Sequence, residues 1–140
     1  MFYADNLTNI TQGKLQGFFV GWPYPPSPQT HLRILQQSYR IVLAIDDKSG
    51  SVVGYLNAIS DGILSAYIPL LEVLPAYQGQ GIGRELVRRM LEQLDDLYMV
   101  DLTCDPDLQE FYAALGMRRA TGMLRRNYEH QAGKDKLRKF

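Results

Sequence analysis

The order of apolar and turn-forming segments predicts an α+β domain with a mixed, mostly antiparallel sheet. Apolar segments at residues 40–46, 51–59 and 63–74 are separated by short turns rich in Asp, Ser and Gly, which is typical of antiparallel hairpins. A glycine-dense turn and an amphipathic helix then lead to a strand at residues 97–104. A strand–helix–strand unit of this size normally pairs its strands in parallel, so the sheet should contain both pairings.

Length and composition fit a single domain spanning residues 1–140. The chain is 46% hydrophobic, which is enough for one core. Fifteen basic residues balance fifteen acidic residues, and this neutrality does not favour nucleic acid or an anionic membrane as a partner. Cys104 is the single cysteine and cannot form an internal disulfide, and no apolar run is long enough to span a bilayer. We therefore expect a soluble, cytoplasmic domain without nucleic-acid or membrane partners.

A short strand and a helix are expected at the N-terminus. Residues 2–7 predict the strand, and Thr11 predicts the start of the helix. Gly13 and Gly17 weaken this helix by about 1 kcal/mol each relative to alanine. The apolar residues expected on one helical face are Leu15, Phe18 and Phe19.

A stiff loop and a second helix follow. Four prolines within residues 21–28 exclude a regular helix and favour an extended conformation. Ser27 is a typical N-cap with Pro28 at the first helical position, and the helix is expected to end near Ser38.

Two further helices are expected after the glycine turn. The first ends near Asp95, before the strand at residues 97–104. Asp105 and Pro106 are a typical N-cap and first-turn pair for the second, which should stop at Gly116.

The C-terminal part is predicted to contain a strand and a tail. Residues 120–128 predict the last strand of the domain. Residues 129–140 are polar and of mixed charge, so we expect a frayed tail there.

The glycine-dense turn at residues 78–84 is the most informative segment. A turn of this kind directs free backbone N–H groups and the positive end of a helix dipole at one point, which favours a phosphate-bearing ligand. Arg84 and Glu85 stand where a P-loop needs Lys and Ser or Thr, and the glycine spacing does not fit a dinucleotide-binding fingerprint. The glycines are Gly79, Gly81 and Gly83.

Two segments resemble signatures of the GNAT superfamily of N-acetyltransferases. Residues 73–83 read Val-x-Pro-x-x-Gln-Gly-x-Gly-Ile-Gly, which is similar to the pyrophosphate-binding motif of that family. Residues 111–117 read Phe-Tyr-Ala-Ala-Leu-Gly-Met, which is similar to its Phe-Tyr-x-x-Leu-Gly-Phe signature. The resemblance covers roughly residues 63–117. The resemblance implies that helices cover both faces of the sheet and that two central strands splay apart. A homodimer is also compatible with the resemblance.

The resemblance also implies that acetyl-CoA is the co-substrate. No Cys/His pair or metal-ligand spacing accompanies Cys104, so the residues indicate no metal. Members of the family transfer the acetyl group directly to a primary amine of a small molecule or peptide. They hold the coenzyme pyrophosphate on the glycine turn and the pantetheine arm beside the central strand. Carried over, the cofactor-binding residues are Leu71, Val73, Gln78, Gly79, Gln80, Gly81, Ile82, Gly83 and Arg84.

Two residues are predicted to be catalytic. Tyr112 matches the family tyrosine that often protonates the coenzyme sulfur, although it could instead pack in an apolar helix face. Glu72 lies within an apolar strand, where a carboxylate is costly unless it is paired or lines a cavity. We predict Glu72 as the base, directly or through a water, with a structural ion pair to an arginine as the alternative. Some family members use only water.

Aromatic residues are predicted to line the acceptor site. In the family this site lies beside the loop between the first two helices. The aromatic residues of that loop could stack on a flat or cationic acceptor, or they could instead cover the core. His31 follows this loop and is expected at the surface. The alternative to an enzyme is a module that binds acetyl-CoA without turnover. The predicted acceptor-site residues are Trp22, Tyr24, Tyr55 and Tyr67.

Overall fold

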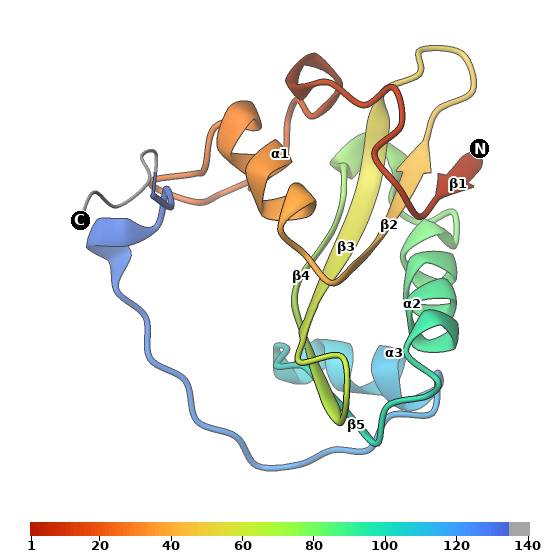
Figure 1. Cartoon of the computed structure of the whole chain (residues 1–140), viewed down its shortest axis with the longest axis vertical. Helices are drawn as coiled ribbons and strands as arrows, with labels where there is room; N and C mark the ends of the chain where they lie inside the picture. The colour runs from red at the N-terminus through yellow and green to blue at the C-terminus, as the bar shows by residue number, and fades with distance from the viewer. Residues whose placement is uncertain (135–140) are drawn as a thin grey trace.

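A five-stranded sheet forms the centre of the computed structural model, which describes residues 1–134 (Figure 1). The strands lie in the order in which the chain makes them, β1 to β5. The first four are antiparallel to their neighbours, and β4 and β5 are parallel, which confirms the predicted α+β class. The strands are β1 (Phe2–Ala4), β2 (Arg40–Ile45), β3 (Val52–Ser60), β4 (Ser65–Val73) and β5 (Met99–Asp101).

Helices cover both faces of the sheet (Figure 1). On one face α2 places Leu86, Val87 and Met90 in the larger apolar core, and on the other α1 places Leu35 in a smaller core. None of the helices within residues 1–134 is long and apolar enough to cross a bilayer. The α-helices are α1 (Pro28–Gln36), α2 (Ile82–Gln93) and α3 (Gln109–Ala113), and single 3₁₀ turns are η1 (Gln12–Lys14), η2 (Pro75–Tyr77), η3 (Pro106–Leu108) and η4 (Tyr128–His130).

Strands β4 and β5 pair over only part of their length. Residues 65–67 of β4 lie opposite residues 99–101 of β5, after which the two chains diverge. Tyr67 of β4 pairs with Ile59 of β3, and Leu70 of β4 pairs with Asn57 of β3. Strand β4 therefore has one residue more than β3 between these two pairs, and the register shifts there. Pro69 lies in this bulge, and it has no N–H group to donate to a neighbouring strand. The rest of β4 is therefore left with an open edge, as expected for a splayed strand pair.

The helix predicted from Thr11 is wrong. Only the 3₁₀ turn η1 forms, and Thr11 makes no side-chain cap hydrogen bond. Gly17 and Phe19 have φ values of +88° and +63°, whereas helical residues need negative φ. The chain from residue 15 to residue 26 is therefore an irregular loop.

The start of α1 is confirmed. The Ser27 hydroxyl accepts a hydrogen bond from the Thr30 N–H at 3.1 Å, and Pro28 is the first helical residue. The helix ends at Gln36, slightly before the predicted end at Ser38.

Several elements are shorter than predicted. Strand β1 ends at Ala4, and β5 contains three residues instead of the eight expected. The helix expected from Asp105 to Gly116 is divided into η3 and the five-residue α3, although Gly116 has the positive φ of +96° that ends a helix.

The predicted strand at residues 120–128 does not form. These residues pair with no strand in the described structure, and all of them are exposed. Part of the expected frayed tail is instead docked on the body, because Gln131 accepts a hydrogen bond from the Tyr24 N–H at 2.8 Å and Arg33 donates to the Lys134 carbonyl at 2.7 Å. The remainder of that prediction, residues 135–140, lies outside the described residues.

Candidate active site

The glycine turn leaves a run of backbone donors without partners. Gly79 and Gly81 have φ values of +78° and +83°, a left-handed conformation that glycine adopts without steric cost. Helix α2 begins directly afterwards at Ile82, with Gly81 at the N-cap position. Among the described residues, the N–H groups of residues 79–84 donate to no acceptor, and the first backbone bond of the helix runs from Glu85 to Gly81. These free donors, at the positive end of a helix dipole, are the kind of groups that an anion can bind.

Open space lies beside two of the glycines. A Cβ atom placed on Gly79 or Gly81 would meet no other atom within 4 Å. A Cβ on Gly83 would lie 3.8 Å from Val73 and 3.9 Å from Phe111. The start of α2, the end of β4 and α3 therefore meet at one point, so the two segments that resemble family signatures are neighbours in space.

The open edge of β4 carries unpaired backbone groups. The Leu74 N–H donates to the Val53 carbonyl of β3 at 2.8 Å. Because successive residues of a strand direct their backbone groups to opposite sides, the N–H groups of Leu71 and Val73 point away from β3 toward the opening. The side-chain amide of Gln78 donates to the Val73 carbonyl on that side at 3.0 Å, which ties the turn to the strand.

Glu72 holds the irregular loop to β4. One carboxylate oxygen accepts a hydrogen bond from the Phe19 N–H at 2.8 Å, and the other accepts from the Val20 N–H at 3.2 Å. The alternative of an ion pair with an arginine is not found within residues 1–134. Each carboxylate oxygen retains a further lone pair, so Glu72 can still accept a proton or a hydrogen bond from a ligand.

Aromatic rings surround His31 beneath the loop. The His31 ring centroid lies 4.3 Å from that of Tyr55, 4.9 Å from that of Phe19 and 5.3 Å from that of Phe18. Contrary to the expected surface position, His31 is only 1% exposed, and neither ring nitrogen has a partner among the described residues. Burial lowers the pKa of His31 to about 4, so the ring is neutral at physiological pH.

Tyr55 is equally buried and supports the loop from below. It is paired with Glu72 across β3 and β4, and only 1% of it is exposed. Burial, and to a lesser extent the negative charge of Glu72, raise the pKa of Tyr55. The role of Tyr55 in the wall of an acceptor site stays a prediction, and in this structure its side chain is buried.

Trp22 and Tyr24 lie at the surface of the loop. They are 37% and 63% exposed, and the Trp22 ring packs on Phe19 with centroids 4.9 Å apart. Glu72 binds the backbone of Phe19, so Trp22 and Glu72 contact the same loop residue. Sequence analysis missed Gln131, which reaches the same loop through the Tyr24 N–H.

Tyr67 lies on β4 where the strand begins to separate from β5. Its hydroxyl and that of Thr103 are 2.9 Å apart, so the pair bridges β4 to the segment after β5. Tyr67 is 37% exposed, which leaves part of the ring available to a ligand.

Tyr112 lies in α3 with its ring largely buried. It is 8% exposed and packs edge-on against Phe111 with centroids 4.9 Å apart. Burial, and to a lesser extent the neighbouring Cys104, raise the pKa of Tyr112. The phenol therefore keeps its proton at neutral pH, as a proton donor must.

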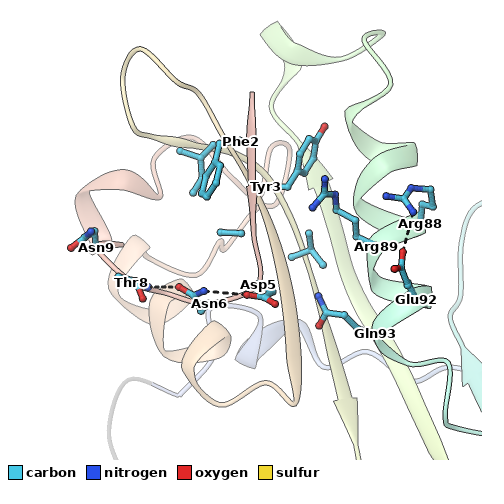
Figure 2. A pocket seen from close by; sticks show the side chains of 13 residues that line it. Phe2, Tyr3, Asp5, Asn6, Thr8, Asn9, Arg88, Arg89, Glu92 and Gln93 are labelled. Carbon is cyan, nitrogen blue, oxygen red and sulfur yellow. Dashed lines mark hydrogen bonds and ion pairs between the residues drawn. The ribbon is translucent and has the colours of Figure 1, made fainter.

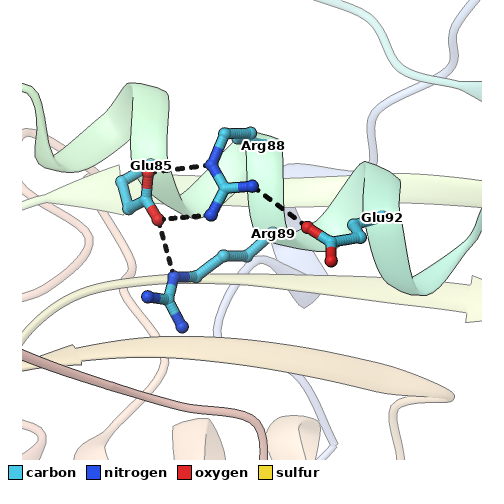
Figure 3. Close-up of polar contacts among 4 residues, drawn as sticks. All are labelled: Glu85, Arg88, Arg89 and Glu92. Carbon is cyan, nitrogen blue, oxygen red and sulfur yellow. Dashed lines mark hydrogen bonds and ion pairs between the residues drawn. The ribbon is translucent and has the colours of Figure 1, made fainter.

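A cavity lies away from the glycine turn. It measures about 770 Å³ and lies between β1 and α2, where Arg88 and Arg89 contribute to its wall (Figure 2). Both arginines are already paired: each hydrogen-bonds to Glu85, and Arg88 also reaches Glu92 (Figure 3). The hydrogen bonds from Arg88, and to a lesser extent the one from Arg89, lower the pKa of Glu85 to about 2. Because the charges are balanced within the helix, this cavity is a poor anion site.

Comparison with known proteins agrees with the geometry. Residues 7–117 match the family model of the acetyltransferase (GNAT) family. A candidate acetyltransferase from Deinococcus radiodurans R1 is 50% identical, with a TM-score of 0.91 over 94% of this chain and 92% of that one. The uncharacterized N-acetyltransferase ycf52 of Porphyra purpurea is 29% identical over 81% of this chain and 68% of its own. Histone acetyltransferase TAP1 of Glycine max is 32% identical over 69% of this chain and 46% of its own.

These matches show that the protein is an acyltransferase, and its mixed sheet agrees with that class. The chain belongs to the GNAT acetyltransferase family.

Proposed function

We propose that this enzyme transfers the acetyl group of acetyl-CoA to a primary amine of a small molecule or peptide. The observation that carries this proposal is the run of unpaired N–H groups over residues 79–84, with open space in front of Gly79 and Gly81. Such a run suits a pyrophosphate, because each charge-assisted hydrogen bond to a phosphate oxygen is stronger than one between neutral groups. Arg84 is exposed in the first turn of α2 and adds positive charge.

The open edge of β4 would hold the rest of the coenzyme. Its pantetheine arm contains amide groups, and the backbone of Leu71 and Val73 offers partners for them. The proposed coenzyme site thus runs from the turn at residues 78–84 along β4 toward Glu72.

The chemistry requires three groups of the protein. Acetyl-CoA supplies the acetyl group as a thioester. The Val73 N–H would donate to the carbonyl oxygen as negative charge develops there. The Tyr112 hydroxyl would give its proton to the departing sulfur, and Glu72 would accept a proton from the acceptor amine, directly or through a water.

The acceptor would approach from the α1 side of β4. The exposed rings of Trp22 and Tyr24 offer surfaces on which a flat or cationic group can stack, and Glu72 supplies the negative charge that attracts an ammonium group. The relatives are named for different acceptors or for none, so these features support an amine without selecting one. A cytoplasmic location stays a prediction, since two matched relatives are named as chloroplastic.

Calorimetric titration with acetyl-CoA, beside ATP and NAD, tests the coenzyme. We expect binding of acetyl-CoA alone, and binding of ATP or NAD instead would contradict the proposal. Release of free thiol with a panel of primary amines then tests turnover. Acetyl-CoA binding without thiol release on any amine would favour the alternative of a module that binds acetyl-CoA without turnover, and competition with longer acyl-CoAs would show the chain-length preference.

A further inference from the structure

The chain enters the glycine turn through η2, whose last residue is Tyr77. The Tyr77 hydroxyl donates to a carboxylate oxygen of Asp46 at 2.7 Å, and this contact joins positions 31 residues apart in the chain. A hydrogen bond to a charged oxygen is stronger than one between neutral groups. Gln78, the first residue of the turn, follows directly, and its side-chain amide donates to the Val73 carbonyl at 3.0 Å. The contact with Asp46 therefore lies at the point where the turn begins.

Asp46 is itself fixed in the turn between β2 and β3. Its other carboxylate oxygen accepts a hydrogen bond from the Lys48 N–H at 2.8 Å. Its backbone N–H donates to the Ser51 carbonyl at 3.0 Å, and its carbonyl accepts from the Gly50 N–H at 2.8 Å. The hydrogen bond from Tyr77, followed by that from the Lys48 backbone, lowers the pKa of Asp46, so the carboxylate is charged at neutral pH. Tyr77 thus binds a fixed, charged acceptor.

The glycine turn has few contacts of its own. A Cβ atom placed on Gly79 or Gly81 would meet no other atom within 4 Å, and the backbone donors of the turn have no acceptor among the described residues. Glycine also has more conformational freedom than any other residue. The position of the turn therefore depends on the contacts at its two ends. At one end Ile82 is buried at the start of α2, and at the other Tyr77 is bonded to the turn between β2 and β3.

We propose that the hydrogen bond between Asp46 and Tyr77 positions the glycine turn for coenzyme binding. Both are positioning residues, since neither belongs to the donors at residues 79–84. The bond restrains the turn before the coenzyme arrives, so less conformational entropy is lost when the pyrophosphate binds. If the binding-competent conformation falls to about one tenth of the population, the apparent affinity falls about tenfold. This inference rests on the proposed use of acetyl-CoA.

Calorimetric titration with acetyl-CoA tests the pair. Tyr77→Phe removes the donor and Asp46→Ala removes the acceptor, so each should weaken binding about tenfold. The double variant should also lose about tenfold, and not about a hundredfold, because both substitutions remove the same bond. Asp46→Asn keeps an oxygen that can accept from Tyr77, so it should restore most of the affinity. Unchanged affinity in Tyr77→Phe, or additive losses in the double variant, would overturn the inference.

Two matched controls come from the same chain. Asp47→Ala removes the neighbouring carboxylate, which pairs with the N-terminal amine and not with Tyr77. Tyr98→Phe removes the hydroxyl of a tyrosine that is 84% exposed and lies just before β5. Both variants should bind acetyl-CoA as the wild type does. A loss in Asp47→Ala as large as that in Asp46→Ala would assign the effect to the whole turn between β2 and β3 and so contradict a specific role of Asp46.

Steady-state kinetics separate positioning from a general loss of stability. In Tyr77→Phe the KM for acetyl-CoA should rise about tenfold, while kcat at saturating acetyl-CoA stays near the wild-type value. The KM for an amine that the wild type acetylates should not change. A loss of folded protein would instead lower kcat and leave both KM values as they are, and that pattern would count against positioning.

Backbone amide NMR relaxation in the absence of coenzyme measures the turn directly. Order parameters at residues 79–81 should fall in Tyr77→Phe, from about 0.85 toward about 0.6, and should keep the wild-type values in Tyr98→Phe. Turn amides that stay rigid in Tyr77→Phe would refute the positioning role. If the wild type binds no acetyl-CoA but Tyr77→Phe loosens the turn, the proposed coenzyme is wrong and the positioning of the turn by Asp46 stands.

Discussion

The two sides of β4 are built in different ways. On the side of α2, the candidate coenzyme site is formed by backbone groups of a contiguous segment, residues 79–84. On the side of α1, the candidate acceptor site is formed by side chains that join distant parts of the chain, such as Glu72 with Phe19 and Gln131 with Tyr24. The first side should therefore tolerate most side-chain changes and respond to changes in backbone conformation. The second side should depend on single side chains.

Removal of the Glu72 carboxylate should have the largest effect. Glu72→Ala leaves the Phe19 and Val20 N–H groups without an acceptor and removes the proposed proton acceptor, so we expect turnover to fall on the order of 1,000-fold. Affinity for acetyl-CoA should change little, because the carboxylate does not contribute to the turn at residues 78–84. Steady-state kinetics and calorimetry measure the two effects. Glu92→Ala, at an exposed position of α2, is the control, and undiminished turnover in Glu72→Ala would remove Glu72 from the site.

A backbone change in the turn should act on the opposite side. Gly81→Val forces a β-branched side chain to a φ of +83° and fills the open space in front of the donors, so affinity for acetyl-CoA should fall on the order of 100-fold or more. Gly50→Val is the matched control, because Gly50 has a similar φ of +72° and lies in the turn between β2 and β3. Calorimetry should show near-normal affinity for the control. Equal losses in both variants would mean that backbone strain, and not the phosphate site, explains the effect.

Loss of the Tyr112 hydroxyl should affect turnover but not binding. Tyr112→Phe keeps the buried ring and removes the proton donor, so kcat should fall by roughly 100-fold, the lower limit for general acid catalysis. Acetyl-CoA affinity should stay within a factor of about two, because the phosphate donors are unchanged. The ratio of the kcat values of the wild type and Tyr112→Phe, measured with the same amine, tests the role of the hydroxyl. Full activity would leave Tyr112 as a residue of the apolar core only.

The buried His31 should make stability depend on pH. Its pKa is about 4 in the folded protein and about 6.5 when unfolded, so the unfolded chain binds the additional proton first as pH falls. Stability contributed by the neutral ring is therefore complete above pH 6.5 and decreases toward pH 4, by roughly 3 kcal/mol, because one pKa unit corresponds to about 1.4 kcal/mol.

Urea unfolding at several pH values measures this dependence. His31→Phe keeps an aromatic ring and should flatten the curve between pH 6.5 and pH 4. Substitution of the exposed His130 is the matched control and should leave the wild-type slope. A wild-type slope in His31→Phe would show that other groups cause the dependence.

The sequence predicted the conformation of the glycine turn better than that of the loop at residues 15–26, for a physical reason. The turn at residues 78–84 owes its shape to its own glycines, so a local pattern is sufficient to predict it. The loop of residues 15–26 owes its shape to Glu72, more than 50 residues away, and nothing in its own pattern indicates the positive φ of Phe19. The short helix predicted from Thr11 failed because this distant contact outweighs a weak local propensity.

The strand predicted at residues 120–128 illustrates a different limit. The segment is extended, as its composition suggested, yet it pairs with no strand within the described residues. The β propensity of a segment describes how well its residues fit a half-buried sheet. It does not say whether the same chain provides a neighbouring strand for that segment to pair with. Pro69 was informative and was overlooked, since a proline inside an apolar strand indicates a bulge or an edge.

The bulge at Pro69 also affects how long the protein survives in a cell. It leaves the end of β4 with an open edge, so the isolated chain has an incomplete sheet. A molecule that binds along this edge stabilises only the folded form, by about 2.7 kcal/mol when its concentration is one hundred times its Kd. Resistance to unfolding and proteolysis should then rise and fall with the concentration of that molecule.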